Sequence, residues 1–326
     1  MSDDGVIALD VGGTGMKCAL VRPDGTVHHA ERHPTPAARG PEAVTATILN
    51  VAAGLADRAR ADGLTPVAAG AAVPGVVDEA NGVAVWSSNV GFRDVPLRDL
   101  LTARLGVPAA LGHDVRAGGL AEARLGAGRG ERHVLFVAIG TGIAAAHVVD
   151  GRAFAGAHGA AGELGHIVVR PGGPPCGCGA RGCLEATASA GAIGRRYAEL
   201  SGADATAVDV AARAAAGEPL AGRIWQDALG ALADGLLTAQ ALFDAGTIVL
   251  GGGLAEAGST LLTPLRAALG QRVTFHRVPR LVRAALGDTA GCLGAALLAL
   301  DSVAPGMTER TERSEGHEGM PRRAPA

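Results

Sequence analysis

Two stretches of the chain repeat one local pattern, about 125 residues apart. Each has an apolar run, a glycine-rich loop, a second apolar run and an Asp-Gly turn. The first stretch comprises residues 6–9, 10–17, 18–21 and 24–25, and the second comprises 133–139, 140–142, 144–149 and 150–151. Short apolar runs joined by glycine loops predict β-hairpins that continue into sheets. The repeat therefore predicts two α/β domains of related topology.

Hydrophobic periodicity and turn residues predict the remaining elements. Helices are expected at 41–61, 97–105, 187–200, 207–216, 220–243, 261–269 and 289–301, and further strands at 67–73, 109–111 and 247–250. We expect an N-terminal α/β domain over 1–117 and a C-terminal α/β domain over 118–302, whose last helix packs back on the N-terminal domain. The stretch 303–326 is rich in Glu, Arg, Pro and Gly, and this composition predicts a disordered tail.

Composition favours a soluble, cytoplasmic protein. The formal net charge of −3 gives no electrostatic reason to expect nucleic acid as a partner. No apolar run approaches the length of a membrane span, and the first residues lack the basic and apolar regions of a signal peptide. We expect neither nucleic acid nor membrane as a partner.

The first glycine loop carries groups suited to phosphate binding. Gly12 and Gly13 allow backbone N–H groups close to phosphate oxygens, and Thr14 and Lys17 add directed donors. Asp10, at the end of the preceding strand, is suited to hold a hydrated Mg²⁺. The loop lacks the spacing of a Walker A motif, and a plain hairpin turn is the alternative interpretation.

Two further glycine loops stand at strand ends. Gly140, Thr141 and Gly142 open the repeat in the second half, and Gly252 and Gly253 lie between a buried strand and a helix. Each loop alone is a weak signal. Three such loops at strand ends are the arrangement required by a nucleotide clamped between two domains.

One histidine and three cysteines form the most specific pattern in the chain. His166 in Gly-Glu-Leu-Gly-His precedes Cys176, Cys178 and Cys183, and glycines between the cysteines allow a tight loop. One imidazole and three thiolates make a closed tetrahedral zinc set, so we expect a structural rather than a catalytic Zn²⁺. Three free cysteines on a flexible loop are the alternative.

These motifs together resemble the ROK family of repressors, open reading frames and sugar kinases, in the actin/hexokinase ATPase superfamily. The resemblance runs from about residue 5 to residue 300 and rests on 10–17, the Cys/His stretch with Glu185, and 248–253. It implies two actin-like (ribonuclease H-like) α/β domains with ATP and sugar in the cleft between them. The implied activity is ATP-dependent phosphorylation of a hexose hydroxyl, most simply glucose to glucose 6-phosphate, by a homodimer or homotetramer.

The resemblance also implies roles for single residues. Asp114 matches the general base that takes the proton of the attacking sugar hydroxyl. Asn89, Glu163, His166 and Glu185 match positions that bind sugar hydroxyls. His166 would use one ring nitrogen for zinc and the other for the sugar, so that the metal fixes the orientation of a substrate contact.

Two departures from the family pattern bear on the substrate and the activity. His113 replaces the Asn that usually precedes the catalytic Asp, so the adjacent hydroxyl is recognised differently. Kanosamine or another amino sugar, an N-acetylhexosamine and a C7-cyclitol are therefore alternatives to glucose. Ala144, Ala145 and Ala146 replace the usual glycine-rich run, and their methyl groups could crowd a phosphate loop.

Two other classes of protein in the same family compete with a kinase. A repressor would carry a DNA-binding module ahead of the first glycine loop, whereas nine residues precede Asp10, so we do not expect one. A non-catalytic sugar sensor is disfavoured by the presence of Asp114 and Lys17. The phosphoryl donor, ATP alone or also polyphosphate, stays open.

Overall fold

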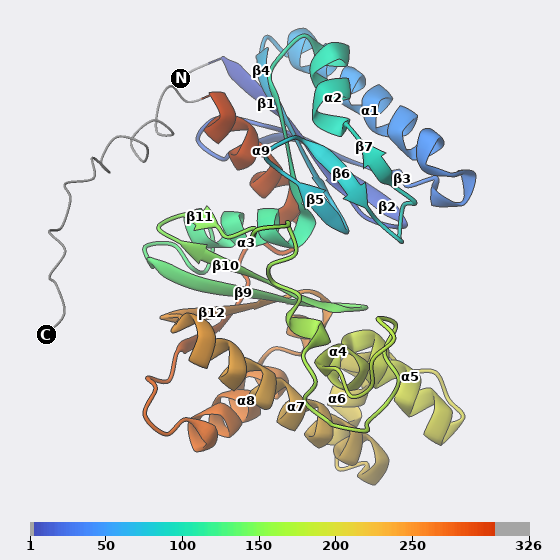
Figure 1. Ribbon diagram of the computed structural model, residues 1–326, viewed down its shortest axis with the longest axis vertical. Helices are drawn as coiled ribbons and strands as arrows, with labels where there is room; N and C mark the ends of the chain where they lie inside the picture. The colour runs from blue at the N-terminus through green and yellow to red at the C-terminus, as the bar shows by residue number, and fades with distance from the viewer. Residues whose placement is uncertain (1–2, 304–326) are drawn as a thin grey trace, which may run out of the picture.

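The computed structural model describes residues 3–303, which form two α/β halves stacked one above the other (Figure 1). Each half contains a five-stranded mixed sheet, in the order β3-β2-β1-β4-β8 in the first half and β11-β10-β9-β12-β13 in the second. The predicted tail falls on residues 303–326. Val303 is the last residue of α9, and residues 304–326 lie outside the described part of the chain.

The first half contains the N-terminal sheet, a small three-stranded sheet and the helices beside them. Its elements are β1 (Asp4–Val11), β2 (Gly15–Val21), β3 (Val27–Pro34), α1 (Pro41–Ala61), β4 (Thr65–Val73), β5 (Val76–Asp78), β6 (Val83–Trp86), β7 (Arg93–Val95), α2 (Leu97–Leu105), β8 (Ala109–His113) and α3 (Asp114–Arg124). The small sheet has the order β5-β6-β7.

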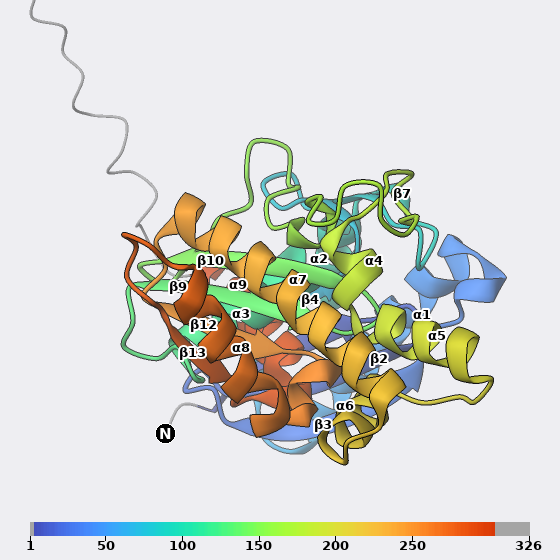
Figure 2. The ribbon, with the colours of Figure 1, turned by 90° about the horizontal axis from the view of Figure 1, so that it is seen from below.

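The rest of the chain forms the second half and, at its end, helix α9, which packs on the first half. Its elements are β9 (His133–Ile139), β10 (Ile143–Val149), β11 (Arg152–Ala153), α4 (Leu184–Ala188), α5 (Ala190–Ser201), α6 (Ala207–Ala215), α7 (Pro219–Phe243), β12 (Thr247–Gly251), α8 (Ser259–Arg272), β13 (Arg280–Arg283) and α9 (Ala290–Val303). Helices α7 and α8 pack against each other across one face of this sheet (Figure 2).

The predicted repeat is confirmed by the strand order. In each half an antiparallel meander of three strands is extended by two parallel strands, because β1 pairs with β4 and β9 pairs with β12 in parallel. The parallel strands end at one edge of each sheet, which is where the glycine loops stand. The predicted α/β class with two related halves is therefore correct.

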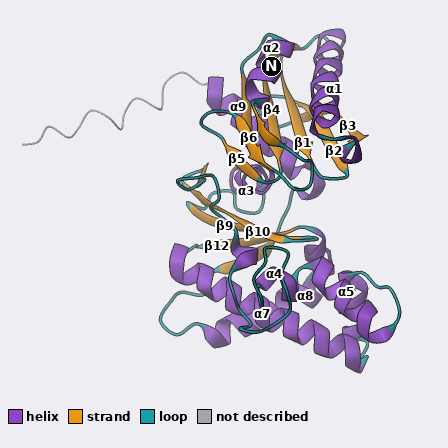
Figure 3. Ribbon diagram, turned by 45° about the vertical axis from the view of Figure 1, so that its right-hand side comes forward, coloured by secondary structure: helices purple, strands orange, loops and turns teal. Residues whose placement is uncertain are grey.

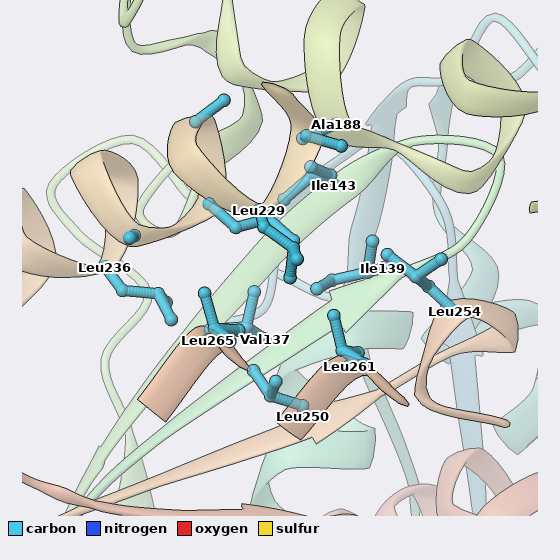
Figure 4. Close-up of a cluster of buried hydrophobic side chains, with 14 of the residues drawn as sticks. Val137, Ile139, Ile143, Ala188, Leu229, Leu236, Leu250, Leu254, Leu261 and Leu265 are labelled. Atoms are coloured by element: carbon cyan, nitrogen blue, oxygen red, sulfur yellow. The ribbon is translucent and has the colours of Figure 1, made fainter. Parts of the chain in front are cut away.

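The core of the second half is built from aliphatic side chains. Figure 4 shows Val137, Ile139 and Leu250 of the sheet meeting Leu229 of α7 and Leu265 of α8. These residues bury nearly all of their surface, and burial of this kind stabilises the fold by about 1.5–3 kcal/mol for each large side chain.

Two helices connect the halves. Helix α3 begins directly after β8 of the first sheet. The same helix packs on β9 and β10 of the second sheet. The final helix α9 returns to the first half, where it packs on β1, β4, β8 and α3 (Figure 3). The two segments of chain that cross between the halves therefore lie side by side.

The structure differs from the sequence predictions at several elements. The helix predicted at 187–200 is two helices, because Ser189 is extended and its hydroxyl caps α5 by accepting from the Ala192 N–H. The helix α3 and the short strands β5–β7 and β13 were not predicted. Helix α3 contains Gly118 and Gly119, which disfavour an isolated helix; here Gly119 allows close packing, since a Cβ there would lie 2.7 Å from the Cβ of Ala146.

Candidate active site

A cavity of about 510 Å³ lies between the two sheets and is lined by residues of both halves. Asp10 and Lys17 come from the first hairpin, Asp114 from the start of α3, and Gly252 and Gly253 from the loop after β12. Five predicted site residues, separated by more than 200 positions in sequence, thus line a single cavity.

Asp114 is the first residue of α3 and lies at the point where strand β8 becomes a helix. One of its oxygens accepts a hydrogen bond from the Val115 N–H at 2.7 Å. Burial raises the pKa of the Asp114 carboxyl, and this effect is opposed by the Val115 N–H and the charge of Arg116. A carboxylate with a raised pKa at the edge of a cavity is suited to accept a proton.

Asp10 and Lys17 lie together near Asp114. The Lys17 ammonium lies 4.0 Å from Asp10 Oδ2 and 3.2 Å from Asp288 Oδ1. Burial raises the pKa of Asp10 to about 6, although Lys17 counteracts this shift. A second cation, Arg32, contacts Asp288 at 2.7 Å. Asp10, Lys17 and Asp288 line this cavity, and Arg32 lines the adjoining one, so groups that bind phosphate and Mg²⁺ gather at this end.

His113 precedes Asp114 and is almost fully buried. Burial, followed by the charge of Arg116, lowers the pKa of His113 to about 4, so its imidazole is neutral at pH 7. Its Nδ1 lies 3.4 Å from Asp114 Oδ1 and has no hydrogen-bond partner among the described residues. The carboxylate of Glu79 accepts from the His113 N–H and from Arg116, which fixes this strand end.

The first glycine loop lies beside the cavity. Gly12 and Thr14 line an adjoining cavity of about 420 Å³ together with Asp10, Lys17 and Asp114. Gly13 lies against Asn89, whose Cβ is 3.2 Å from the place that a Cβ on Gly13 would occupy. The predicted sugar contact Asn89 is therefore adjacent to the loop predicted to bind phosphate.

The middle glycine loop, residues 140–142, lies outside the lining of the 510 Å³ cavity. Gly140, Thr141 and Gly142 form the tight turn between β9 and β10, where the Gly140 N–H donates to the Gly142 carbonyl. The described residues that line the 510 Å³ cavity do not include these three. Ala145 and Ala146 are buried inside strand β10 rather than in a loop, so their methyl groups pack in the core.

Glu163 and His166 lie at the short turn Leu164–His166 of the second half, and Glu185 lies in α4, which packs on that turn. Glu163 lies close enough to His113 to influence its pKa, which it raises. His166 Nε2 lies 3.7 Å from Glu163 Oε2. Glu185 accepts a hydrogen bond from the Ile143 N–H at 2.9 Å, and this bond ties α4 to the start of β10. Glu163 thus lies within electrostatic reach of the residue before Asp114, and His166 lies beside Glu163.

His166, Cys176, Cys178 and Cys183 form a compact cluster, with all four ligand atoms within 4.8 Å of one another. His166 Nδ1 lies 3.6 Å from Cys176 Sγ, and Cys178 Sγ lies 3.7 Å from Cys183 Sγ. A tetrahedral zinc with bonds of about 2.3 Å to sulfur holds its sulfur atoms about 3.7 Å apart. The donor set and its spacing therefore fit a structural zinc ion.

Several residues around the cavity were not predicted from the sequence. Asp288 and Gly291 come from the segment that begins α9, Glu122 from α3, Glu256 from the short 3-10 turn after β12, and Arg283 from the last position of β13. Their contacts join residues far apart in the chain. Asp288 and Thr289 directly precede α9, and residues of these types are typical of the start of a helix.

Comparisons with known proteins agree on one family. The model of the ROK family matches residues 6–302. The chain is 35% identical to a glucokinase of Thermotoga maritima, with 91% of this chain and 98% of that protein aligned. It is 34% identical to an N-acetylmannosamine kinase of Citrobacter koseri, with 90% and 98% aligned.

The structure is also similar to that of a ROK family glucokinase from Streptomyces griseus in complex with glucose and AMPPNP. The TM-score is 0.77 at 28% sequence identity, covering 91% of this chain and 99% of that one. Within residues 3–303, none of the helices is both long enough and apolar enough to span a membrane.

Proposed function

This chain belongs to the ROK family, and we propose that it is an ATP-dependent kinase that phosphorylates a hydroxyl of glucose or a close hexose analogue. Its two α/β halves have the actin-like fold of that family. The observation that carries the proposal is the position of Asp114. This carboxylate lines one cavity with Lys17, Asp10 and Gly252, and the residue before it, His113, lies within electrostatic reach of Glu163.

The chain's own residues have the following roles in the proposed reaction. Asp114 accepts the proton of the attacking hydroxyl, since burial raises its pKa toward the range useful to a base. Lys17 and the backbone of Gly12, Gly13 and Thr14 bind phosphate oxygens, and Gly252 and Gly253 hold the nucleotide on the other side, with 140–142 as a further loop of the clamp. Positioning and charge neutralisation dominate in such a loose transition state.

Asn89, His113, Glu163, His166 and Glu185 are proposed to hold the sugar hydroxyls. Carboxylates and amides can bond paired hydroxyls on adjacent ring carbons. His166 would present its Nε2 to the sugar, because its Nδ1 faces the cysteine cluster.

The donor groups of this structure fit two metal ions. Asp10 would hold Mg²⁺ through water, and this ion supplies charge neutralisation at the transferring phosphoryl group when bound. His166, Cys176, Cys178 and Cys183 would hold a structural Zn²⁺, which fixes the orientation of the His166 ring.

A glucose analogue is the second candidate substrate. His113 is neutral and leaves a buried ring nitrogen without a partner beside Asp114, so it suits a substituent other than the one that the family Asn recognises. Similarity to an N-acetylmannosamine kinase favours the same alternative, which includes amino sugars, N-acetylhexosamines and C7-cyclitols.

We further propose that the N-terminal domain covers 1–117 and the C-terminal domain 118–302, with α9 packed on the N-terminal sheet. Cytoplasmic location, a homodimer or homotetramer, and the absence of nucleic-acid partners stay predictions from composition and family. Whether polyphosphate replaces ATP as the donor is tested by supplying each separately.

The decisive experiment measures ADP release by the purified protein with Mg-ATP, with and without D-glucose, alongside Asp114→Asn. We expect glucose to stimulate release and the variant to lose at least about 100-fold of that stimulation, which is the usual contribution of a general base. Stimulation only by amino sugars, N-acetylhexosamines or cyclitols would identify the second candidate. No stimulation by any sugar, in folded protein, would favour the sugar sensor instead.

A further inference from the structure

Glu122, in the third turn of α3, is a fully buried carboxylate that binds only backbone N–H groups. Its Oε1 accepts from the Leu286 N–H at 2.7 Å, and its Oε2 accepts from the N–H groups of Ala285 at 3.1 Å and Ala127 at 2.9 Å. No salt bridge to Glu122 occurs within residues 3–303. Hydrogen bonds to a charged acceptor are stronger than neutral ones, so this carboxylate fixes two loops to one helix.

Glu122 lies on the face of α3 that lines the 510 Å³ cavity. Val115, Gly118 and Glu122 all line it, and their spacing of three and four residues places them on one side of the helix. The same helix begins with Asp114. Helix α3 therefore carries the proposed base at one end and the buried carboxylate about two turns farther on.

The loop that Glu122 binds leads directly to the phosphate end of the cavity. Leu286 accepts from the N–H and the hydroxyl of Thr289, which tightens the turn before α9. Asp288 in that turn contacts Lys17 and Arg32. The first turn of α9 follows, and its Gly291 lies against Asp10. The position of this turn thus determines where Asp288 and Gly291 meet the first hairpin.

We propose that Glu122 is a positioning residue that sets the nucleotide-binding wall at 284–291 relative to the helix that carries Asp114. This role rests on the proposed function, because it concerns the nucleotide of that reaction. Glu122 acts through the backbone of Ala285 and Leu286 and does not itself contact the reacting groups. Glu122 thereby fixes the position of the bound nucleotide relative to the carboxylate of Asp114.

The test compares wild-type protein with Glu122→Gln, which keeps the size of the side chain but replaces one acceptor oxygen with an N–H donor that faces a backbone N–H. Binding of a non-hydrolysable ATP analogue with Mg²⁺ is measured by calorimetry, together with KM for ATP and KM for sugar. We expect the Kd of the ATP analogue and the KM for ATP each to rise by about tenfold, the effect of one lost charge-assisted hydrogen bond. The KM for sugar should change by less than about twofold.

Glu199→Gln is the matched control, since Glu199 is exposed on α5, away from this cavity, and its variant removes the same charge. Equal nucleotide affinity in folded Glu122→Gln and wild type would overturn the proposal. Equal losses of affinity for nucleotide and for sugar in Glu122→Gln would also overturn the proposal, because they would indicate a general structural role. Wild-type protein that binds the analogue without turning over sugar would contradict the proposed function alone.

A second measurement uses wild-type protein and does not depend on the folding of a variant. Hydrogen exchange is followed at the Leu286 amide without nucleotide. We expect protection comparable with that of the buried strand β12, since the amide is bonded to a buried carboxylate. Exchange at the rate of an exposed loop would overturn the proposal.

Discussion

The carboxylate of Asp10 lies directly against Gly291, so that a Cβ on residue 291 would be 2.3 Å from Asp10 Cγ and Oδ2. Asp10 is the last residue but one of the first strand of the chain, whereas Gly291 is the second residue of the last helix. Only a residue without a side chain allows this approach. The two ends of the described chain thus meet at the proposed Mg²⁺ site.

Gly291→Ala should therefore displace Asp10 or the start of α9. We expect a loss of at least about tenfold in sugar-dependent ADP release and a loss of stability of about 1–3 kcal/mol, as for other overpacked sites. Turnover and chemical denaturation measure the two effects. Gly270→Ala in α8 is the control, because its Cβ would enter open space; unchanged activity in Gly291→Ala would contradict the prediction.

Asp10 should make the nucleotide-free protein less stable at neutral pH. Its pKa is raised from 3.8 to about 6, so the fold favours the protonated carboxyl. A raised pKa gives a stabilising contribution at low pH that is lost as the pH rises from about 4 to about 6. Asp10→Asn should therefore be about 2 kcal/mol more stable than wild type at pH 7.5, with a smaller difference at pH 4.5.

Denaturant titrations at both pH values, without Mg²⁺ or nucleotide, measure this difference. The same variant should lose turnover, since it lacks the carboxylate proposed to hold Mg²⁺. A stability difference that does not depend on pH would show that Asp10 titrates normally.

His113→Asn should change the preference among sugars rather than the use of ATP. The neutral imidazole offers one donor or acceptor at each nitrogen, whereas an amide offers both types of group to an adjacent hydroxyl. We expect the ratio of kcat/KM for glucose to that for an amino sugar to rise by at least about tenfold. A sugar panel at fixed Mg-ATP measures this ratio, and an unchanged ratio with unchanged KM for ATP would exclude a role for His113 in selectivity.

Metal removal should weaken sugar binding more than nucleotide binding. We expect one zinc ion per chain by plasma emission, none in Cys178→Ser, and an unaltered content in Cys18→Ala, because Cys18 lies in the core of the first half. Loss of the ion frees the His166 ring, which faces Glu163 on its other side. Calorimetry with glucose and with an ATP analogue measures how much affinity for each is lost when zinc is removed. Equal affinities for glucose with and without zinc would contradict the prediction.

Local patterns in the sequence were enough to predict much of the fold. The helices α1 and α2 and the strand β9 occur at the predicted residues, because the helices have apolar periodicity, β9 is a continuous apolar run, and each has a glycine or proline beside it. The cysteine cluster was predictable because its four ligands lie within 18 residues, between His166 and Cys183. The strand order confirms that the Asp-Gly turns mark two related halves.

Other parts of the site depend on contacts between residues far apart in the sequence, and no local sequence pattern predicts them. Glu122 reaches residues more than 160 positions away, and Asp288 reaches Lys17 across 271 positions. A glutamate at residue 122 has the same helical propensity whether it is exposed or fully buried. The strands of the small sheet have three or four residues each, too few for an alternating pattern to be recognised.

The return of α9 to the first sheet has a consequence for synthesis of the chain on the ribosome. This helix, 14 residues long, covers Val6, Ala8 and Ala68 of strands made at the very beginning. The N-terminal half therefore emerges with one apolar face uncovered, and that face stays open until the last helix has left the exit tunnel. A truncation before residue 290 would leave the same face exposed, and such a fragment should bind chaperones and aggregate where the longer chain does not.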